Sequence, residues 1–200
     1  MRGWPAVLRA GEVTIRPLRR SDGTQWLALR ARNAAWLAPW EATSPEPLTG
    51  RPPSFAKFVR SLRAQAREGS ALPFAIDYRG SLVGQITVAT IARGSLQSAS
   101  IGYWVSEHVA GRGIAPTAVA LDVDHCLGPV GLHRVEINVR PENRASLRVV
   151  AKLGLRDEGV RERYLHIQGR WCDHRTFAVT AEEVPGGLLA RLRASGTTTV

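Results

Sequence analysis

Cysteine is scarce in this chain. Only Cys126 and Cys172 are present among 200 residues, and neither has metal-ligand spacing. This excludes a disulfide-stapled secreted scaffold and gives no reason to expect a metal, so we expect a reducing cytoplasm and two free thiols. No activating partner has catalytic spacing with either thiol, which favours buried small apolar residues over nucleophiles.

Long hydrophobic runs are absent as well. No stretch of about eighteen apolar residues occurs, which argues against a membrane span. The first residues carry charge but no apolar core of a signal peptide, so we expect no secretion signal. With 44% hydrophobic and 22% charged residues, the composition is that of a globular protein with one core.

Basic residues, in contrast, are abundant. The net charge is +10, and every basic residue except Lys57 and Lys152 is arginine. Two interpretations are open: an acidic partner such as ribosomal RNA or a phosphate-rich cofactor, or the codon bias of a GC-rich genome. Arg161, Arg163 and Arg170 either meet ribosomal RNA or are simply solvated.

Hydrophobic periodicity and turn residues predict a mixed α/β chain. Helices are expected at 21–33, 54–68, 115–127 and 141–153, with a shaped loop at 34–54; strands are expected at 12–18, 72–79, 81–91, 98–106, 133–139, 164–169 and 171–180. The expected fold is one α/β domain over 12–182, with a mostly antiparallel sheet of about seven strands and helices on both faces. Residues 1–11 would be a lead and 183–200 a flexible tail.

The stretch "EHVAGRGIAPTAV", residues 107–119, carries the clearest chemical signal. Gly111 and Gly113 precede a helix whose first turn holds Pro116, and converging backbone N–H groups at such a helix start attract phosphate. Ile114 and Ala115 replace the Lys-Ser/Thr pair of a nucleotide-binding P-loop, and the dinucleotide fingerprint also fits poorly. An ordinary tight turn between strand and helix is the alternative.

Two segments in this order, "IGYWVSEHVAGRGIAPTAV" and "PENRASLRVVAKLGL", resemble the Gcn5-related N-acetyltransferases. The pyrophosphate loop of that family reads Gln/Arg-x-x-Gly-x-Gly/Ala and aligns with 110–115, where Ala110 departs from the pattern. The segments "WLAPWEAT" and "YLHIQGRWCDHRTFAVT" narrow the resemblance to the Rim-type ribosomal-protein alanine N-acetyltransferases. The resemblance covers residues 12 to about 182 and implies acetyl-CoA as cosubstrate.

The resemblance also implies roles for single residues. The backbone N–H of Val105 would polarise the thioester carbonyl, Asn143 would hydrogen-bond the pantetheine arm, and Ser146 would protonate the departing sulfur. Asn143 equally reads as a helix N-cap. The full set expected to bind the cofactor is Trp104, Val105, Ala110, Gly111, Arg112, Gly113, Ile114, Ala115, Pro116, Asn143 and Ser146.

Four residues are candidates for the general base. Glu107 is the first choice, and His108, Glu136 and His166 are alternatives. A strong base is not required for a protein α-amine, whose pKa of about 7.7–8.0 leaves a sizeable neutral fraction, whereas lysine has a pKa of about 10.4.

Aromatic residues indicate an acceptor groove. Trp36 and Trp40 flank Pro39 and would either cover the core or form one wall, with Tyr103 and His166 completing the groove. The resemblance implies acetylation of the N-terminal Ala or Ser of a protein, in particular a ribosomal protein. A small-amine acetyltransferase and a non-catalytic ribosome-binding protein are the alternatives.

Overall fold

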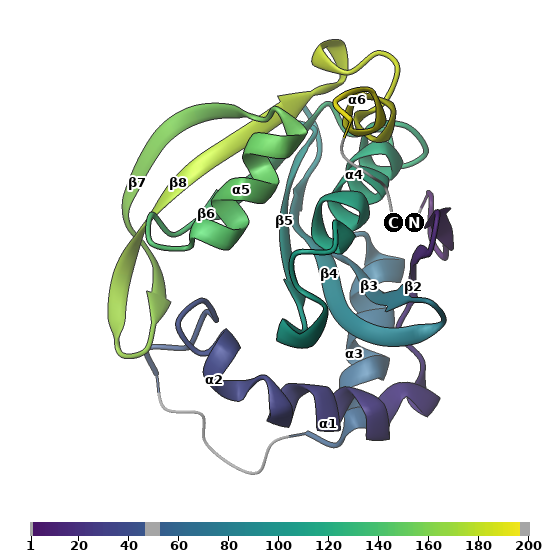
Figure 1. Cartoon of the computed structure of the whole chain (residues 1–200), viewed down its shortest axis with the longest axis vertical. Helices are drawn as coiled ribbons and strands as arrows, with labels where there is room; N and C mark the ends of the chain where they lie inside the picture. Colours follow the sequence, from purple (N-terminus) through teal and green to yellow (C-terminus); the bar gives the residue numbers. More distant parts are fainter. Residues whose placement is uncertain (1, 47–52, 197–200) are drawn as a thin grey trace.

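The structure is a computed structural model that describes residues 2–46 and 53–196. Eight strands form one sheet in the order β1-β2-β3-β4-β5-β6-β8-β7 (Figure 1). Their bounds are β1 Leu8–Ala10, β2 Val13–Pro17, β3 Leu72–Tyr78, β4 Ser81–Ala92, β5 Ser98–Val105, β6 Arg134–Val139, β7 Arg156–Ile167 and β8 Arg170–Thr180. All neighbours are antiparallel except β5 and β6, which are parallel. The predicted mixed, mostly antiparallel sheet is confirmed.

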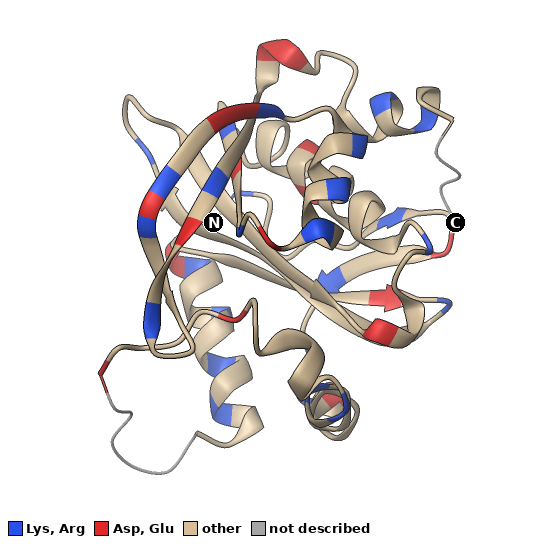
Figure 2. Ribbon diagram, turned by 60° about the vertical axis from the view of Figure 1, so that its left-hand side comes forward, with Lys and Arg blue, Asp and Glu red and all other residues tan. Residues whose placement is uncertain are grey.

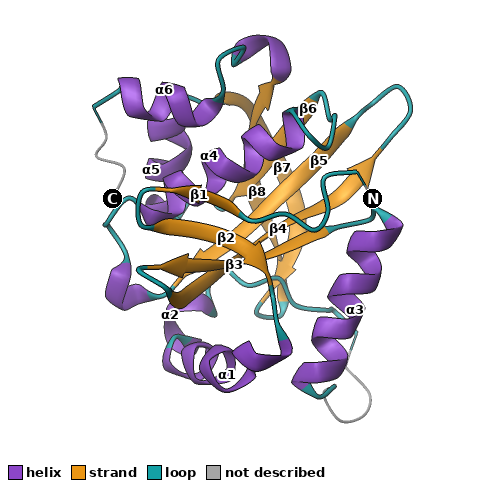
Figure 3. Cartoon of the chain, turned by 90° about the vertical axis from the view of Figure 1, so that its right-hand side faces the viewer, coloured by secondary structure: helices purple, strands orange, loops and turns teal. Residues whose placement is uncertain are grey.

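Helices cover both faces of this sheet (Figure 3). They are α1 Gly23–Arg32, α2 Ala34–Leu37, α3 Phe55–Glu68, α4 Ile114–Leu127, α5 Arg144–Leu153 and α6 Leu188–Ala194. The larger core cluster joins one sheet face to α4, α5 and α6, and the smaller one joins the other face to α1 and α3. Strand β3 contributes Phe74 to the first cluster and Ala75 to the second, so it is buried along its whole length.

Helix α3 follows directly from its sequence. The Ser54 hydroxyl accepts a hydrogen bond from the Lys57 N–H, and Gly69 ends the helix in the left-handed conformation. The apolar residues at helical spacing, Val59, Leu62 and Ala66, are buried. The opposite, basic face of α3 is therefore left toward solvent.

The parallel pair β5–β6 is paired for only three residues. Ser98–Ser100 lie beside Arg134–Glu136, and no further pairing follows, although β5 continues to Val105 and β6 to Val139. The two strands diverge toward their carboxyl ends (Figure 1). This divergence exposes the edge of β5 next to the loop that leads into α4.

Both ends of the domain differ from the predicted bounds. Residues 8–10, expected in the lead, form β1, the eighth strand, and the Trp4 ring packs edge-on against Phe74 with centroids 5.2 Å apart. In the expected tail, α6 buries Leu188 and Leu192 completely. Local composition does not predict these two ordered ends, because their order comes from packing on the core. Residues 1 and 197–200 lie outside the described part of the chain.

The segment 34–54 also differs from the predicted loop. It begins with the short helix α2, while residues 47–52 lie outside the described residues. Across the described residues, no helix is both long and apolar enough to cross a membrane.

Candidate active site

The start of α4 forms a cradle of backbone amides. Gly111 and Gly113 have φ of 82° and 81°, and Gly113 is the N-cap of the helix. Both adopt the left-handed conformation that favours glycine. A Cβ added to Gly111 would meet no protein atom within 4 Å, so the space in front of the loop is open to a ligand. The first amides of α4 and the positive end of its dipole complete a site for an anion.

A cavity of about 930 Å³ extends from this cradle across the end of β5 to α1 and α2. It brings together nearly all of the residues that the sequence singled out. Those that line it are Trp36, Trp40, Tyr103, Trp104, Val105, Ala110, Gly111, Gly113, Ile114, Ala115, Pro116, Asn143 and Ser146. We call this cavity the catalytic cleft.

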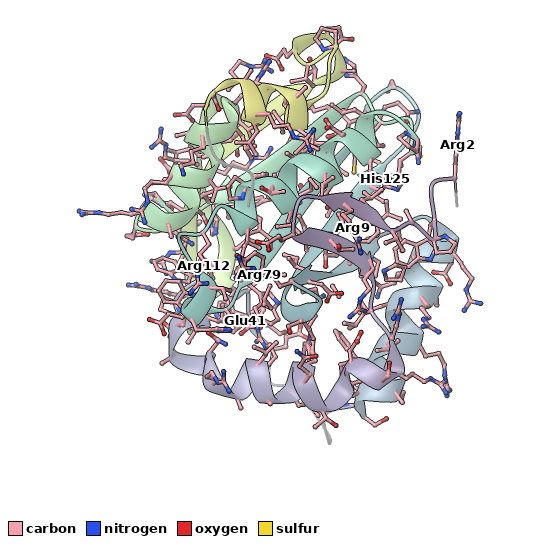
Figure 4. All side chains as sticks on the ribbon, turned by 45° about the vertical axis from the view of Figure 1, so that its right-hand side comes forward. Arg2, Arg9, Glu41, Arg79, Arg112 and His125 are labelled. Atoms are coloured by element: carbon pink, nitrogen blue, oxygen red, sulfur yellow. The ribbon has the colours of Figure 1, made fainter. Side chains whose placement is uncertain are left out.

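Three of the predicted residues do not line the catalytic cleft: Glu107, Arg112 and His166. The Glu107 side chain is exposed, and its backbone N–H donates to the Asn33 side-chain oxygen at 2.9 Å. Arg112 lies in the cradle loop, and Figure 4 labels it on the same side of the molecule as Glu41. Glu107 therefore lies outside the catalytic cleft, and its role as general base stays a prediction.

The first turn of α5 combines a cap and a candidate donor. The Asn143 side-chain oxygen accepts the backbone N–H of Ser146 at 3.0 Å, which confirms the N-cap interpretation. Because Ser146 contributes only its backbone to the cap, its hydroxyl is left for the cleft. Both residues line the cleft, so capping and ligand binding coexist here.

Tyr103 and Trp104 lie on opposite faces of β5. Tyr103 packs with the α4 and α5 cluster, and Trp104 packs with the α1 and α3 cluster. Both residues line the catalytic cleft, and the sequence expectation that Trp104 contacts the cofactor and Tyr103 the acceptor stays a prediction. Side chains alternate along a strand, and which residue points to which face is decided by the neighbouring helices.

The Tyr103 hydroxyl is buried and has no hydrogen-bond partner among the described residues. Burial raises the pKa of Tyr103 to about 12, and the Ser146 hydroxyl beside it partly offsets this rise. A buried hydroxyl without a partner is costly unless a ligand satisfies it. This orphaned group and the open space at Gly111 both fit a polar, phosphate-bearing ligand in the cleft.

The other end of the catalytic cleft is rich in tryptophan. Trp26, Trp36, Trp40 and Trp104 all line it, and sequence analysis missed Trp26. The Trp36 ring N–H donates to the Val105 carbonyl at 3.2 Å, which ties α2 to the end of β5. The aromatic side chains thus line this end of the cleft, and Trp26 and Trp104 also pack against the core.

Both acidic side chains that line the catalytic cleft are paired with arginine. Glu41 forms an ion pair with Arg30, whose guanidinium lies 5.4 Å from the Trp104 ring centre. Glu142 lies 3.2 Å from Arg140, and its pKa is lowered first by a hydrogen bond from its own backbone N–H and then by the Arg140 contact. Sequence analysis missed both carboxylates, although Arg140 is only two residues from Glu142 in the sequence.

Three basic residues line the cleft on α5. Arg144, Arg148 and Lys152 stand four residues apart and so share one helix face. They face a cleft that already holds the amide cradle of α4. Together the two helices supply the charge and the N–H groups that phosphates require.

His166 lies outside the catalytic cleft and contacts a segment that leads into its lining. Its Nδ1 lies 2.9 Å from the Thr43 hydroxyl, and its carbonyl accepts the Thr43 N–H at 2.8 Å. These bonds hold the segment that follows α2 against the β7–β8 hairpin. That segment carries Trp40, Glu41 and Ala42 into the cleft lining.

Comparison with known proteins gives one consistent picture. Residues 12–156 match the family described as "Acetyltransferase (GNAT) domain". The chain is 30% identical over 176 residues to "Probable N-acetyltransferase YjcK" of Bacillus subtilis, covering 86% of this chain and 96% of that protein. It is 25% identical to "[Ribosomal protein uS5]-alanine N-acetyltransferase" of Escherichia coli, covering 90% and 93%. Among solved structures, "Mycobacterium smegmatis RimJ in complex with CoA-disulfide" is similar with a TM-score of 0.90 and 41% identity, covering 98% and 97%.

Proposed function

The chain belongs to the acetyltransferase (GNAT) family, and from this premise we propose that it acetylates the N-terminal α-amine of a ribosomal protein that begins with Ala or Ser. Acetyl-CoA is the acetyl donor in this proposal. Relatives that act on ribosomal proteins support the acceptor class, and such an acceptor places the reaction in the cytoplasm.

One observation carries the choice of an α-amine. Glu41 and Glu142 are the two acidic side chains among the described cleft residues, and each is already paired with an arginine. Deprotonating a lysine rather than an α-amine costs about 3.4 kcal/mol more, for a pKa difference of about 2.5. Neither carboxylate of the described cleft lining is free of an arginine partner.

Different residues of the chain would bind the donor phosphates, stabilise the reacting carbonyl and position the acceptor amine. The amides of 111–115 and the basic side chains Arg144, Arg148 and Lys152 would hold the phosphates of the donor. The exposed edge of β5, at Val105, would orient the thioester carbonyl and stabilise the charge that develops on its oxygen. The tryptophan side chains of the cleft would position the acceptor amine for attack.

Proton movements complete the reaction. As the C–N bond forms and the C–S bond breaks, the amine loses one proton to bulk water, and the leaving thiolate gains one from the Ser146 hydroxyl. Water that enters the cleft would then return a proton to Ser146. Thiols have a pKa of about 8.5, so the donor has only to be polar and close. Glu107 stays an untested prediction as base, and Glu107→Gln decides it: unchanged kcat/KM favours water.

Two peptides test the proposal. One begins with a free Ala, and the other has a blocked N-terminus and one internal Lys. We expect kcat/KM to favour the Ala peptide by about a hundredfold near neutral pH, given the difference in pKa. If the Lys peptide or a free small amine is the better substrate from about pH 6 to about pH 9, the N-terminal assignment is wrong.

A further inference from the structure

A second cavity, of about 520 Å³, lies between the N-terminal segment and α3. Half of its lining residues are arginine, and none is acidic. The lining is Trp4, Pro5, Pro17, Arg20, Val59, Arg60, Arg63 and Arg67. We call it the arginine groove, and nothing in the catalytic cleft uses these residues.

Helix geometry gathers the charges on one face. Arg60, Arg63 and Arg67 stand three and four residues apart, so they rise along α3 in steps of about 4.5 and 6 Å. All three side chains are exposed, as is that of Arg20 on the neighbouring segment. Figure 2 shows several basic bands along α3, with the acidic residue only at its end. The result is a continuous strip of positive charge.

Three of these four arginines lack an acidic partner in the part of the chain that the structure describes. Among the described residues, Arg20, Arg60 and Arg63 have no ion pair with an acidic side chain. On the β7–β8 side, by contrast, Arg161 pairs with Glu136 at 2.7 Å and Arg156 pairs with Glu158 at 2.8 Å. The arginine groove is therefore better placed than that hairpin to attract an external polyanion.

The floor of the groove is apolar. Trp4 is half-buried, with its ring against Phe74, and the two prolines and Val59 complete the surface. Figure 4 shows Arg2, two residues before Trp4, extending from the N-terminal segment into solvent. A flat apolar floor bordered by arginines matches a ligand in which planar bases alternate with phosphates.

We propose that the arginine groove binds the sugar-phosphate backbone of single-stranded RNA. The choice of RNA rests on the proposed function, because a protein acceptor in a ribosome is surrounded by RNA. Helix α3 also contributes Phe58 to the catalytic cleft, so one element connects the two sites. RNA held in the groove would keep the neighbouring protein N-terminus near the cleft.

The test measures binding of a short fluorescein-labelled single-stranded RNA by anisotropy at a series of KCl concentrations. The double variant Arg60→Ala/Arg63→Ala should bind more weakly, with the slope of log K against log[KCl] flattened by about 1.4 for two lost phosphate contacts. The matched control, Arg32→Ala/Arg193→Ala, removes the same charge from exposed positions that line neither cavity and should keep most of the affinity and slope.

Activity separates this inference from the proposed function. Both double variants should acetylate the free Ala peptide with the wild-type kcat/KM, because neither touches the catalytic cleft. If the peptide is not acetylated by the wild type, the proposed function fails, whatever the RNA data show. If the peptide is acetylated but both double variants lose RNA binding equally, or if a poly-glutamate peptide binds the groove as tightly as RNA, the RNA site is wrong.

Discussion

Gly111 combines a left-handed backbone conformation with open space beside its Cα. Its left-handed φ is needed for the turn, and the empty space beside its Cα is needed for a ligand. The two requirements can be separated experimentally, because Gly80 has nearly the same φ, 79°, and the same open surroundings in a turn far from the cleft. One substitution at each position therefore compares equal strain at different places.

We expect Gly111→Ala and Gly80→Ala to lose similar stability, about 1 kcal/mol, because each forces a Cβ into the left-handed region. Only Gly111→Ala should lose the thermal stabilisation by acetyl-CoA, which at about 100 times Kd is worth about 2.7 kcal/mol in the wild type. An undiminished acetyl-CoA shift in Gly111→Ala would refute the phosphate cradle.

Ser146→Ala tests the proton donor. Because the cap uses the backbone N–H of Ser146, the variant keeps its helix cap and should keep its stability. We expect kcat to fall by about tenfold or more while KM changes little, as for an interaction made in the transition state. Asn143→Ala is the control: it should cost about 1 kcal/mol of stability through the lost cap. Equal turnover in Ser146→Ala would remove the serine from the mechanism.

Asp122 has no part in the proposed mechanism, although burying its carboxyl group without a partner is unfavourable for folding. It is completely buried on α4, and neither carboxylate oxygen has a hydrogen-bond partner among the described residues. Burial raises the pKa of Asp122 well above its ordinary value. Its contribution to stability is therefore fully present below the unfolded pKa, near 4, and is lost as pH rises toward the folded pKa.

Asp122→Asn should flatten this pH dependence. Its advantage in urea unfolding free energy over the wild type should grow from about pH 4 to about pH 8, because the variant has no proton to lose. Asp157→Asn is the opposite control, since Arg175 lowers the pKa of Asp157 and its contribution is lost as pH falls. A constant difference between wild type and Asp122→Asn at all pH values would contradict the assignment.

At the scale of elements, the divergence of β5 and β6 creates the cleft, and the segment after α2 closes its acceptor end. That segment is held by the bonds of Thr43 to His166 on the β7–β8 hairpin. His166 was expected in the groove itself. The structure instead places it outside the cleft lining, in contact with Thr43.

His166→Ala should therefore loosen the acceptor wall and leave the cofactor half intact. We expect KM for the Ala peptide to rise by about fivefold, for about 1 kcal/mol of lost hydrogen bonding, with kcat and acetyl-CoA affinity nearly unchanged. Gln168→Ala, an exposed change in the same hairpin, should leave KM at the wild-type value. A fall in acetyl-CoA affinity equal to the rise in KM would show that His166 supports the whole cleft instead.

At the scale of the molecule, the two ends of the described chain complete the core. Leu192 on α6 is fully buried although the surrounding sequence looks like a flexible tail. Leu192→Ala should lower the unfolding free energy by about 2–5 kcal/mol. The neighbouring Arg193→Ala, at an exposed position, should change it by less than about 0.5 kcal/mol. Similar small effects of both changes, measured by urea denaturation, would mean that α6 is dispensable.

The amino-acid sequence by itself determined most of the helices and strands and the glycine turn before α4. Hydrophobic periodicity predicted α3, the turn glycines predicted the start of α4, and Asn143 predicted the N-cap of α5. Each of these signals is local, because it lies within a few residues along the chain. The mixed sheet and most of its helices followed from such local patterns, whereas the family resemblance supplied the predicted residues that line the catalytic cleft.

Only the tertiary structure decided the contacts between distant segments. It placed Tyr103 beside Ser146, paired Arg30 with Glu41, and left Glu107 outside the cleft. It also brought the N-terminal segment next to α3 to form the arginine groove. The physical reason is common to all of these: a charge or hydroxyl acquires its role from its partner and its burial, and both are set by how the strands and helices pack.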